Sequence, residues 1–355
     1  MAKSHHFSHV AQASTYQVFD ALRRNGAMSR AAIAAHTGIT RPTVSGATER
    51  LVAAGLVCPT DRRTTGQGRA GVIYEIAPHY GVILAIAVDG ESVHVAIKSL
   101  ADTWLEQRVF PCPDLNQPHA LPDQLLALLT PLIERINLPV KAMGISVAAP
   151  VDPESCQAVR LPLLPFGAIC EVSLKDYFGG RLGCPVVIDN DVNWAALAEV
   201  TYGAMQGQRN FICVYLGKGI GAGIYLEGHL IRGGAGLAGE LGYVPVEEHI
   251  NLQDYVTAAA ANNPGLHEAN AQRDRAIAHI GKVIATASIV VNPDALVLTG
   301  PLSEFPAVFD RVKEAISGYL LRPLPVLQSH MPEDAPVRGA ACGAYQKMLA
   351  QTGLL

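Results

Sequence analysis

The chain lacks the long hydrophobic runs and paired cysteines of membrane and disulfide-bonded proteins. Its longest apolar run, near residues 283–291, is far shorter than the ~20 residues that span a bilayer. The first ten residues hold one Lys, several His and no apolar core, so we expect no secretory signal. The seven cysteines form no C-x-x-C pair, and no two are closer than 14 positions. We therefore expect a cytoplasmic protein with reduced thiols, no membrane contact and no zinc or disulfide framework.

The composition is that of a soluble globular protein with an uneven distribution of charge. With 355 residues, 49% of them apolar, the chain predicts two or three domains of about 100 to 150 residues each. The net charge of −4 conceals a basic head, because residues 1–70 hold nine Lys or Arg and three acids. A basic head on an acidic body favours a polyanion as partner of the head. Charge alone is equally consistent with a solvated basic surface.

The first 55 residues carry three short helical patterns joined by tight connections. Ser29 is the expected N-cap of the second helix, which ends at Gly38, and Thr40 caps the third. Small polar and basic residues lie on the outer side of the third helix, namely Arg41, Thr43 and Ser45. This pattern predicts a helix-turn-helix whose last helix enters the DNA major groove through those residues. Gly46, on the same side, allows close backbone approach but offers no hydrogen bond.

The segment that follows predicts a β-hairpin with a polar, glycine-rich tip. Its basic residues are Arg62, Arg63 and Arg69. Arginines at such a tip suit contacts with phosphates or a narrow minor groove. We therefore interpret residues 1–78 as a winged helix-turn-helix that binds DNA.

From residue 79 onward, strand and helix patterns alternate, which indicates α/β layers. The most unusual stretch is 217–243, in which ten of 27 residues are glycine and the apolar positions between them predict short strands. Glycine lets such a backbone approach a phosphate or sugar closely. Glu240, near its end, can accept hydrogen bonds from hydroxyls. Two α/β lobes with a cleft between them are the expected architecture.

Five motifs of the body resemble those of the ROK family, named for its repressors, open reading frames and sugar kinases. They occur in the order found in that family: GISVAAPVD (144–152), VVIDNDVNWAALAE (186–199), GKGIGAGI (217–224), GGAGLAGELGY (233–243) and VNPDALVLTGPL (291–302). The N-terminal winged helix resembles that of the family's transcriptional-regulator branch. The resemblance implies an α/β fold in which the head precedes a two-lobed actin-like and hexokinase-like (RNase H-like) domain over residues 79–355. Lobe one would comprise about 79–188 plus the C-terminal helix, and lobe two about 189–335.

The resemblance also implies where a sugar would bind. Asp191 stands at the position of the kinase base and Asn190 at the position that orients the sugar. The same pair is also expected to cap the helix that starts at Val192, and the two roles are compatible. Glu240, Tyr243 and Gln253 complete the expected ligand-binding set.

The chain departs from the kinase pattern at two places. Kinases of the family resemble D-x-G-G-T at the first strand, whereas this chain has Asp89-Gly90-Glu91-Ser92, which places a carboxylate near the phosphates. The family's second phosphate loop, GKGIGAG, is intact, but its glycines are as consistent with a tight hairpin as with phosphate binding. The family's zinc site resembles a histidine followed by a cysteine loop, whereas here Tyr243 stands in the histidine's place and no cysteine follows. We therefore expect no metal, no other cofactor and no catalytic residue, with Asp191 as a vestigial base.

The sequence thus predicts a transcriptional regulator, a repressor of carbohydrate-related genes, with operator DNA and a sugar or sugar phosphate as partners. Helix-turn-helix heads commonly bind two DNA half-sites, one with each copy of the chain. This predicts a homodimer or higher homo-oligomer. An ATP-dependent sugar kinase with a DNA-binding head is the alternative. A regulator whose body responds to a protein partner instead of a small molecule also remains open.

Overall fold

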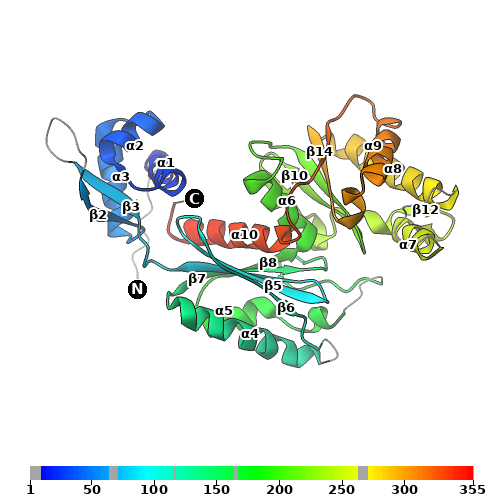
Figure 1. Cartoon of the computed structure of the whole chain (residues 1–355), viewed down its shortest axis with the longest axis horizontal. Coiled ribbons are helices and arrows are strands. Elements are labelled where there is room, and N and C mark those ends of the chain that lie inside the picture. The colour runs from blue at the N-terminus through cyan, green and yellow to red at the C-terminus, as the bar shows by residue number, and fades with distance from the viewer. Residues whose placement is uncertain (1–8, 64–70, 115–116, 163–166, 263–270, 355) are drawn as a thin grey trace.

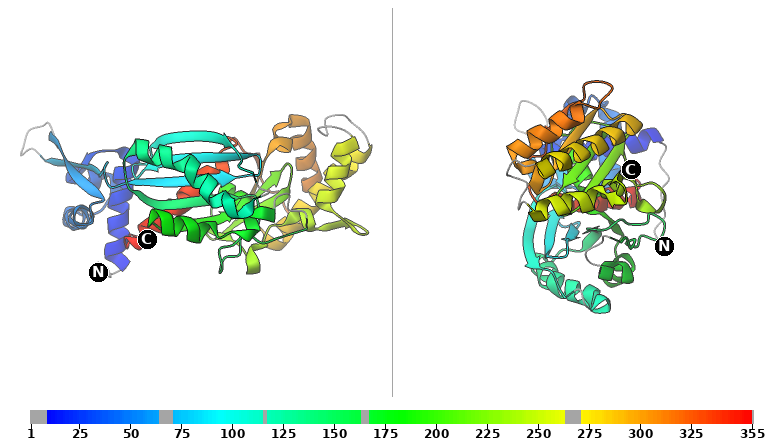
Figure 2. Two further views of the ribbon diagram at one scale, coloured as in Figure 1. Left: turned by 90° about the horizontal axis from the view of Figure 1, so that it is seen from below. Right: turned by 90° about the vertical axis from the view of Figure 1, so that its right-hand side faces the viewer.

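The structure, a computed structural model, describes residues 9–63, 71–114, 117–162, 167–262 and 271–354. It has a small helical head at one end and two sheet-containing lobes that follow one another along the long axis (Figures 1 and 2). The elements of the head are α1 (His9–Asn25), β1 (Met28–Ser29), α2 (Arg30–Thr37), α3 (Arg41–Ala53), β2 (Val57–Arg63) and β3 (Val72–Ile76).

The head confirms the predicted helix-turn-helix and its caps. The Ser29 hydroxyl accepts a hydrogen bond from the Ala32 N–H, and α2 ends at Gly38, whose φ of 72° is left-handed. Thr40 caps α3 in the same way, with a Pro in the first turn. Strands β1, β3 and β2 form a small sheet in that order, so the predicted wing is also present. Arg62 and Arg63 end strand β2, whereas Arg69 lies outside the described residues.

The first lobe is a five-stranded sheet in the order β6-β5-β4-β7-β8. Strands β4, β5 and β6 form an antiparallel meander, and β7 and β8 continue the sheet in parallel with β4. Helices α4 and α5 cover one face of this sheet and α10 covers the other (Figure 1). The bounds are β4 (Val82–Val88), β5 (Ser92–Ser99), β6 (Trp104–Pro111), α4 (Leu121–Ile136), β7 (Val140–Val147), α5 (Leu174–Leu182), β8 (Val186–Asn190) and α10 (Ala335–Gln351).

The second lobe repeats the same sheet topology. Its order is β11-β10-β9-β14-β15, again an antiparallel meander whose first strand, β9, pairs in parallel with β14, which in turn pairs in parallel with β15. The two sheets therefore confirm the predicted two-lobed actin-like architecture. The bounds are β9 (Phe211–Leu216), β10 (Ile220–Leu226), β11 (His229–Ile231), β12 (Pro245–Glu247), β13 (Ile250–Asn251), α7 (Leu252–Asn262), α8 (Ala271–Val291), β14 (Ala295–Thr299), α9 (Pro306–Ser317) and β15 (Val326–Gln328).

Helix α6 (Asp191–Tyr202) lies between the two sheets. It packs against α10 on one side and against β9 and β10 on the other. Eight consecutive residues, from Val192 to Glu199, are buried, so this part of the helix has no solvent-facing side. Two short 3₁₀ turns come after β11, namely η3 (Gly234–Gly236) and η4 (Leu241–Tyr243), and η5 (Pro301–Glu304) follows β14.

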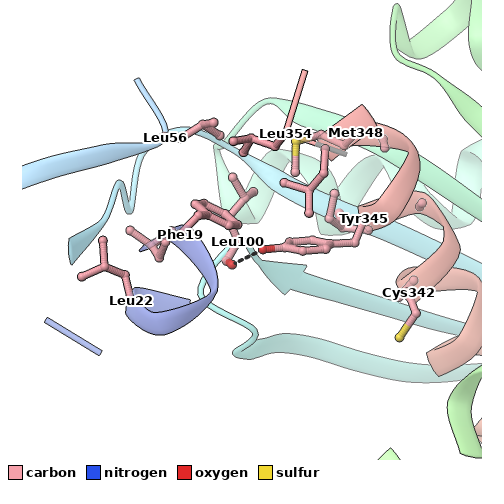
Figure 3. Close-up of a cluster of buried hydrophobic side chains, with 14 of the residues drawn as sticks. Phe19, Leu22, Leu56, Leu100, Cys342, Tyr345, Met348 and Leu354 are labelled. Carbon is pink, nitrogen blue, oxygen red and sulfur yellow. Dashed lines mark hydrogen bonds between the residues drawn. The ribbon is translucent and has the colours of Figure 1, made fainter. Parts of the chain in front are cut away.

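The head shares a hydrophobic core with the first lobe (Figure 3). Phe19 and Leu22 of α1 belong to the same cluster of buried side chains as Leu100, Tyr345 and Met348 of the body. The Tyr345 hydroxyl donates to the Leu100 carbonyl at 3.0 Å, which fixes α10 against the turn between β5 and β6. The head is therefore packed onto the body rather than attached by a linker alone.

Candidate functional site

A cleft of about 480 Å³ lies between the two lobes. Its lining includes all five residues predicted to bind a ligand, which are Asn190, Asp191, Glu240, Tyr243 and Gln253. They come from the β8–α6 junction, from η4 and its preceding residue, and from the first turn of α7. The fold thus brings together side chains that are up to 63 positions apart in the sequence.

The Asn190-Asp191 pair caps helix α6 at the floor of the cleft. The Asn190 side-chain oxygen accepts from the backbone N–H of Val192 at 2.9 Å and of Asn193 at 3.4 Å. An Asp191 carboxylate oxygen accepts from the same Val192 N–H at 2.8 Å. The predicted cap is confirmed, although the helix starts at Asp191, one residue earlier than expected.

Two carboxyl groups in the cleft have strongly raised pKa values. Loss of solvation is the main cause at Asp191, with a contribution from the negative charge of Asp89, and it raises the pKa to about 6. Loss of solvation also raises the pKa of Glu240, to about 7, and the charge of Asp191 adds to this. The two groups therefore influence each other's ionisation across the cleft.

An ion pair between a buried carboxylate and a partly exposed arginine, which the sequence did not reveal, fixes the β8–α6 junction. The Asp189 carboxylate lies 2.6 Å from the guanidinium Nε of Arg232, which follows β11. Asp189 also accepts from the Asn193 side-chain amide at 2.9 Å and from the Asn190 N–H at 2.8 Å. The sequence carries one signal for this ion pair. Asp189 ends the apolar strand VVID, and a carboxylate buried there requires a partner.

Gly239 determines where Glu240 lies. Its φ is 92°, and a Cβ atom at this position would collide with the carbonyl of Ala222. The Gly239 carbonyl in turn accepts from the Ala222 N–H at 2.8 Å, so the loop is held directly on strand β10. The glycine-rich stretch is thus a scaffold that presents Glu240 to the cleft.

The segment from Asp89 to Ser92, at the position of the kinases' first phosphate loop, forms hydrogen bonds within itself. One carboxylate oxygen of Asp89 accepts from the N–H groups of Glu91 at 2.8 Å and Ser92 at 2.7 Å, and the other accepts from the Ser92 hydroxyl at 2.8 Å. Burial acts to raise the pKa of Asp89, but these hydrogen bonds hold it below its usual value. Glu91 forms an ion pair with Lys218 of the second loop, GKGIGAG. The sequence pattern predicts only that Glu91 repels phosphate. It does not reveal that Lys218, across the cleft, is the partner of Glu91.

The residues at the position of the family's zinc site do not fit the metal. Tyr243 faces the cleft, and the hairpin of β12 and β13 leads directly into α7 without a cysteine. His249 sits at the tip of this hairpin with a side chain that is 92% exposed. Gln253 donates to the Lys218 carbonyl at 2.9 Å, while its side-chain oxygen is enclosed and has no partner among the described residues.

Several further lining residues were not singled out from the sequence. They are supplied by β5, the end of β14, η5 and the segment before α10, and include His94, Thr299, Glu304 and Glu333. Thr299 belongs to the motif VNPDALVLTGPL, so the motif could have identified it as a lining residue. The others join the cleft only through the packing of distant elements.

In the head, the predicted DNA-contacting residues of α3 lie on its open side. Arg41 and Thr43 are exposed and Ser45 is partly exposed. The Thr43 hydroxyl lies 2.8 Å from that of Thr40, and the Ser45 hydroxyl donates to Glu49 at 3.2 Å. Arg62 is exposed at the end of β2, and the side chain of Arg63 and all of Arg69 lie outside the described part of the head.

Other arginines of the head have structural partners instead. Arg50 donates to the Thr15 hydroxyl at 2.9 Å and thereby ties α3 to α1. Arg23 and Arg24 both pair with Asp20 on α1. Arg23, Arg24 and Arg50 therefore serve contacts within the protein.

Comparisons with known proteins agree with this geometry. Residues 83–253 and 246–347 match the ROK family, and residues 12–64 match the MarR family. The chain is 23% identical over 353 residues to the xylose repressor of Bacillus spizizenii, covering 89% of this chain and 90% of the repressor. In the described residues, no helix combines the length and apolarity needed to cross a bilayer.

Solved structures share the fold. A ROK family transcriptional regulator, described as a homologue of the E. coli MLC protein, superposes with a TM-score of 0.70 at 19% identity and covers 98% of this chain and 100% of its own. A ROK family glucokinase from Streptomyces griseus, in complex with glucose and AMPPNP, has a TM-score of 0.59 at 23% identity and covers 75% of this chain and 100% of its own. The whole length of the kinase therefore corresponds to three quarters of this chain. With the ROK match extending over most of its length and a winged helix in front, the chain belongs to the ROK family, in its transcriptional-regulator form.

Proposed function

We propose that this chain is a repressor of carbohydrate-related genes that binds operator DNA through its head and a sugar or sugar phosphate in the cleft. The observation that carries the proposal is the packing of a winged helix-turn-helix onto the first lobe of a two-lobed body, whose kinase-like cleft has a first phosphate loop hydrogen-bonded to its own Asp89. Such a first loop would hold a nucleotide poorly, because the N–H groups of Glu91 and Ser92 already donate to Asp89.

In the head, Arg41, Thr43 and Ser45 would contact the major groove, and Arg62, Arg63 and Arg69 the backbone or minor groove. The short polar side chains of α3 suit base edges and phosphates at close range. We place the boundary between head and body at residues 78 and 79, with the lobes divided near residue 188. Binding to two half-sites calls for a homodimer or higher homo-oligomer, which would act in the cytoplasm with the DNA.

In the cleft, Asn190, Asp191 and Glu240 would hold sugar hydroxyls, and Tyr243 and Gln253 would close the side where the family's metal site stands in other members. The enclosed oxygen of Gln253 is a ready acceptor for a hydroxyl. A ligand can change DNA binding only if its affinity differs between the two arrangements of the lobes. Closure of the lobes around the sugar would supply that difference.

The DNA-binding proposal is tested by a gel shift with the DNA upstream of the chain's own gene. We expect sequence-selective binding that weakens steeply with salt and is lost in Arg41→Ala. Arg24→Ala is the matched control, because Arg24 is an exposed arginine that pairs with Asp20 within α1. Equal binding to unrelated DNA of the same length would contradict the proposal.

A sugar kinase with a DNA-binding head is the second candidate, favoured by Asp191. A carboxylate with a pKa of about 6, on the floor of the cleft, has the properties of a general base near neutral pH. The test is ADP release from ATP in the presence of hexoses, in the full chain and in Asp191→Asn. Hexose-dependent release that disappears in the variant would establish the kinase, and its absence in both would favour the repressor.

A further inference from the structure

The walls of the cleft are acidic. Six carboxylate side chains line it, from both lobes: Asp89, Glu91, Asp191, Glu240, Glu304 and Glu333. Among the described lining residues Lys218 is the one lysine or arginine, and its ammonium group is paired with Glu91. His94 also lines this space. An anion that enters it therefore meets six carboxylates against one lysine and one histidine from the described lining.

The fields of these carboxylates overlap inside the cleft. Loss of solvation raises the pKa of Tyr215 to about 12, and the charges of Asp191, Asp89 and Glu333 add to the effect. Asp191 likewise contributes to the raised pKa of Glu240. Groups from both lobes therefore act on one volume, which makes the potential in it negative.

Three features that could receive a phosphate are already occupied by groups of the chain itself. The N–H groups of the β4–β5 turn donate to Asp89. The first turn of α6 donates to Asn190 and Asp191, so the helix N-terminus is capped. The ammonium of Lys218 is held by Glu91. Each would have to lose an internal partner before it could bind a phosphate.

We propose that the ligand of the cleft is an unphosphorylated sugar, and that the cleft rejects the phosphate ester of the same sugar. This inference rests on the proposed function of the cleft and narrows it. Sugar hydroxyls donate hydrogen bonds and are satisfied by a lining rich in carboxylates and by the Gln253 oxygen. A phosphate group at neutral pH offers mainly acceptors and two negative charges, so the same lining repels it.

The experiment measures binding of matched pairs to the full chain by calorimetry and thermal shift. The probes are glucose and glucose 6-phosphate, N-acetylglucosamine and its 6-phosphate, xylose and its 5-phosphate, and inorganic phosphate. We expect at least one free sugar to bind, and its ester to bind at least about tenfold more weakly. An ester that binds as tightly as its parent sugar would overturn the inference.

Glu91→Gln tests the cause of the rejection. The variant keeps the size of the side chain, removes one charge and releases Lys218. Because both side chains are 75% exposed, we expect the ratio between sugar and ester affinities to shrink by about threefold. Glu248→Gln is the matched control, because Glu248 lies in the exposed β12–β13 turn outside the lining, and it should leave the ratio as it is. An unchanged ratio in Glu91→Gln would refute the role of the Glu91–Lys218 pair.

The outcomes separate this inference from the proposed function. If no sugar in the panel binds while the same preparation still binds its upstream DNA, the ligand inference fails and a protein partner becomes the favoured effector. If an ester binds best, the sugar-responsive repressor stands and only the inference fails. If DNA binding is also absent, the proposed function itself fails.

Discussion

At the scale of single residues, Glu240 couples the stability of the unliganded protein to pH. Its carboxyl pKa is raised from 4.5 to about 7, chiefly by loss of solvation. The folded state therefore binds more protons than the unfolded state between these values, so this group's contribution falls as pH rises through the window. We expect Glu240→Gln to stabilise the free protein by roughly 1–3 kcal/mol at pH 8 and by almost nothing at pH 4.5. Thermal unfolding of both proteins across pH 4.5–8 measures this difference.

The same substitution should weaken the response to sugar, because an NH2 donor replaces one of the two carboxylate oxygens that could accept from sugar hydroxyls. Glu248→Gln serves again as the control, since its side chain is 92% exposed and removal of its charge should leave the pH profile unaltered. A gain in stability of equal size at pH 4.5 and pH 8 would show that burial of the charge is not its cause.

At the scale of elements, helix α3 contains a glycine where a longer residue would stabilise it. A Cβ atom at Gly46 would lie 3.5 Å from the guanidinium of Arg50, an ordinary contact. Gly46→Ala should therefore stabilise the helix by about 0.5–1 kcal/mol. If α3 lies close to the DNA backbone at this point, the same change should weaken operator binding about tenfold. Melting temperature and gel shift measure the two effects separately.

Gly180→Ala provides the matched control for this prediction. Gly180 is an exposed glycine in helix α5, and a Cβ atom there would have no neighbour within 4 Å. It should raise stability by a similar amount and leave DNA binding unaltered. Equal DNA affinity in both variants would show that the backbone of α3 does not approach the DNA at Gly46.

The elements of this chain were predictable where the determining contacts are local. The caps at Ser29, Thr40 and Asn190 bind N–H groups two or three residues away, so sequence spacing identifies them. Asp189 and Arg232 are 43 positions apart, and Glu91 and Lys218 lie on different lobes. Such pairs depend on how the two sheets face each other, and no local pattern encodes that. The sequence thus predicted which residues line the cleft better than which of them pair.

At the scale of the whole molecule, a partly buried polar network joins the head to the end of α6, in addition to the core that the head shares with the first lobe. Arg23 of α1 pairs with Asp102 in the β5–β6 turn, and Asp102 pairs with the buried Lys98. The Tyr202 hydroxyl lies 2.7 Å from Lys98 Nζ and 3.1 Å from Asp102. Tyr202 is the last residue of α6 and Asp191, in the cleft, is the first. One buried helix therefore contacts both the ligand site and the surface on which the head rests.

This continuity predicts that head and body unfold together. Leu100 is 1% exposed and packs between α1 and α10, so Leu100→Ala should cost roughly 2–5 kcal/mol and loosen the head in particular. In calorimetry we expect one transition for the natural chain and a separate, earlier transition of the head in the variant. Leu129→Ala is the matched control, because Leu129 is equally buried but lies in the core on the opposite face of the sheet. It should lower the main transition without dividing it. If both variants melt in a single transition, the shared core does not hold the head, and a signal from the cleft would have to reach the DNA by the wing or by contacts between protomers.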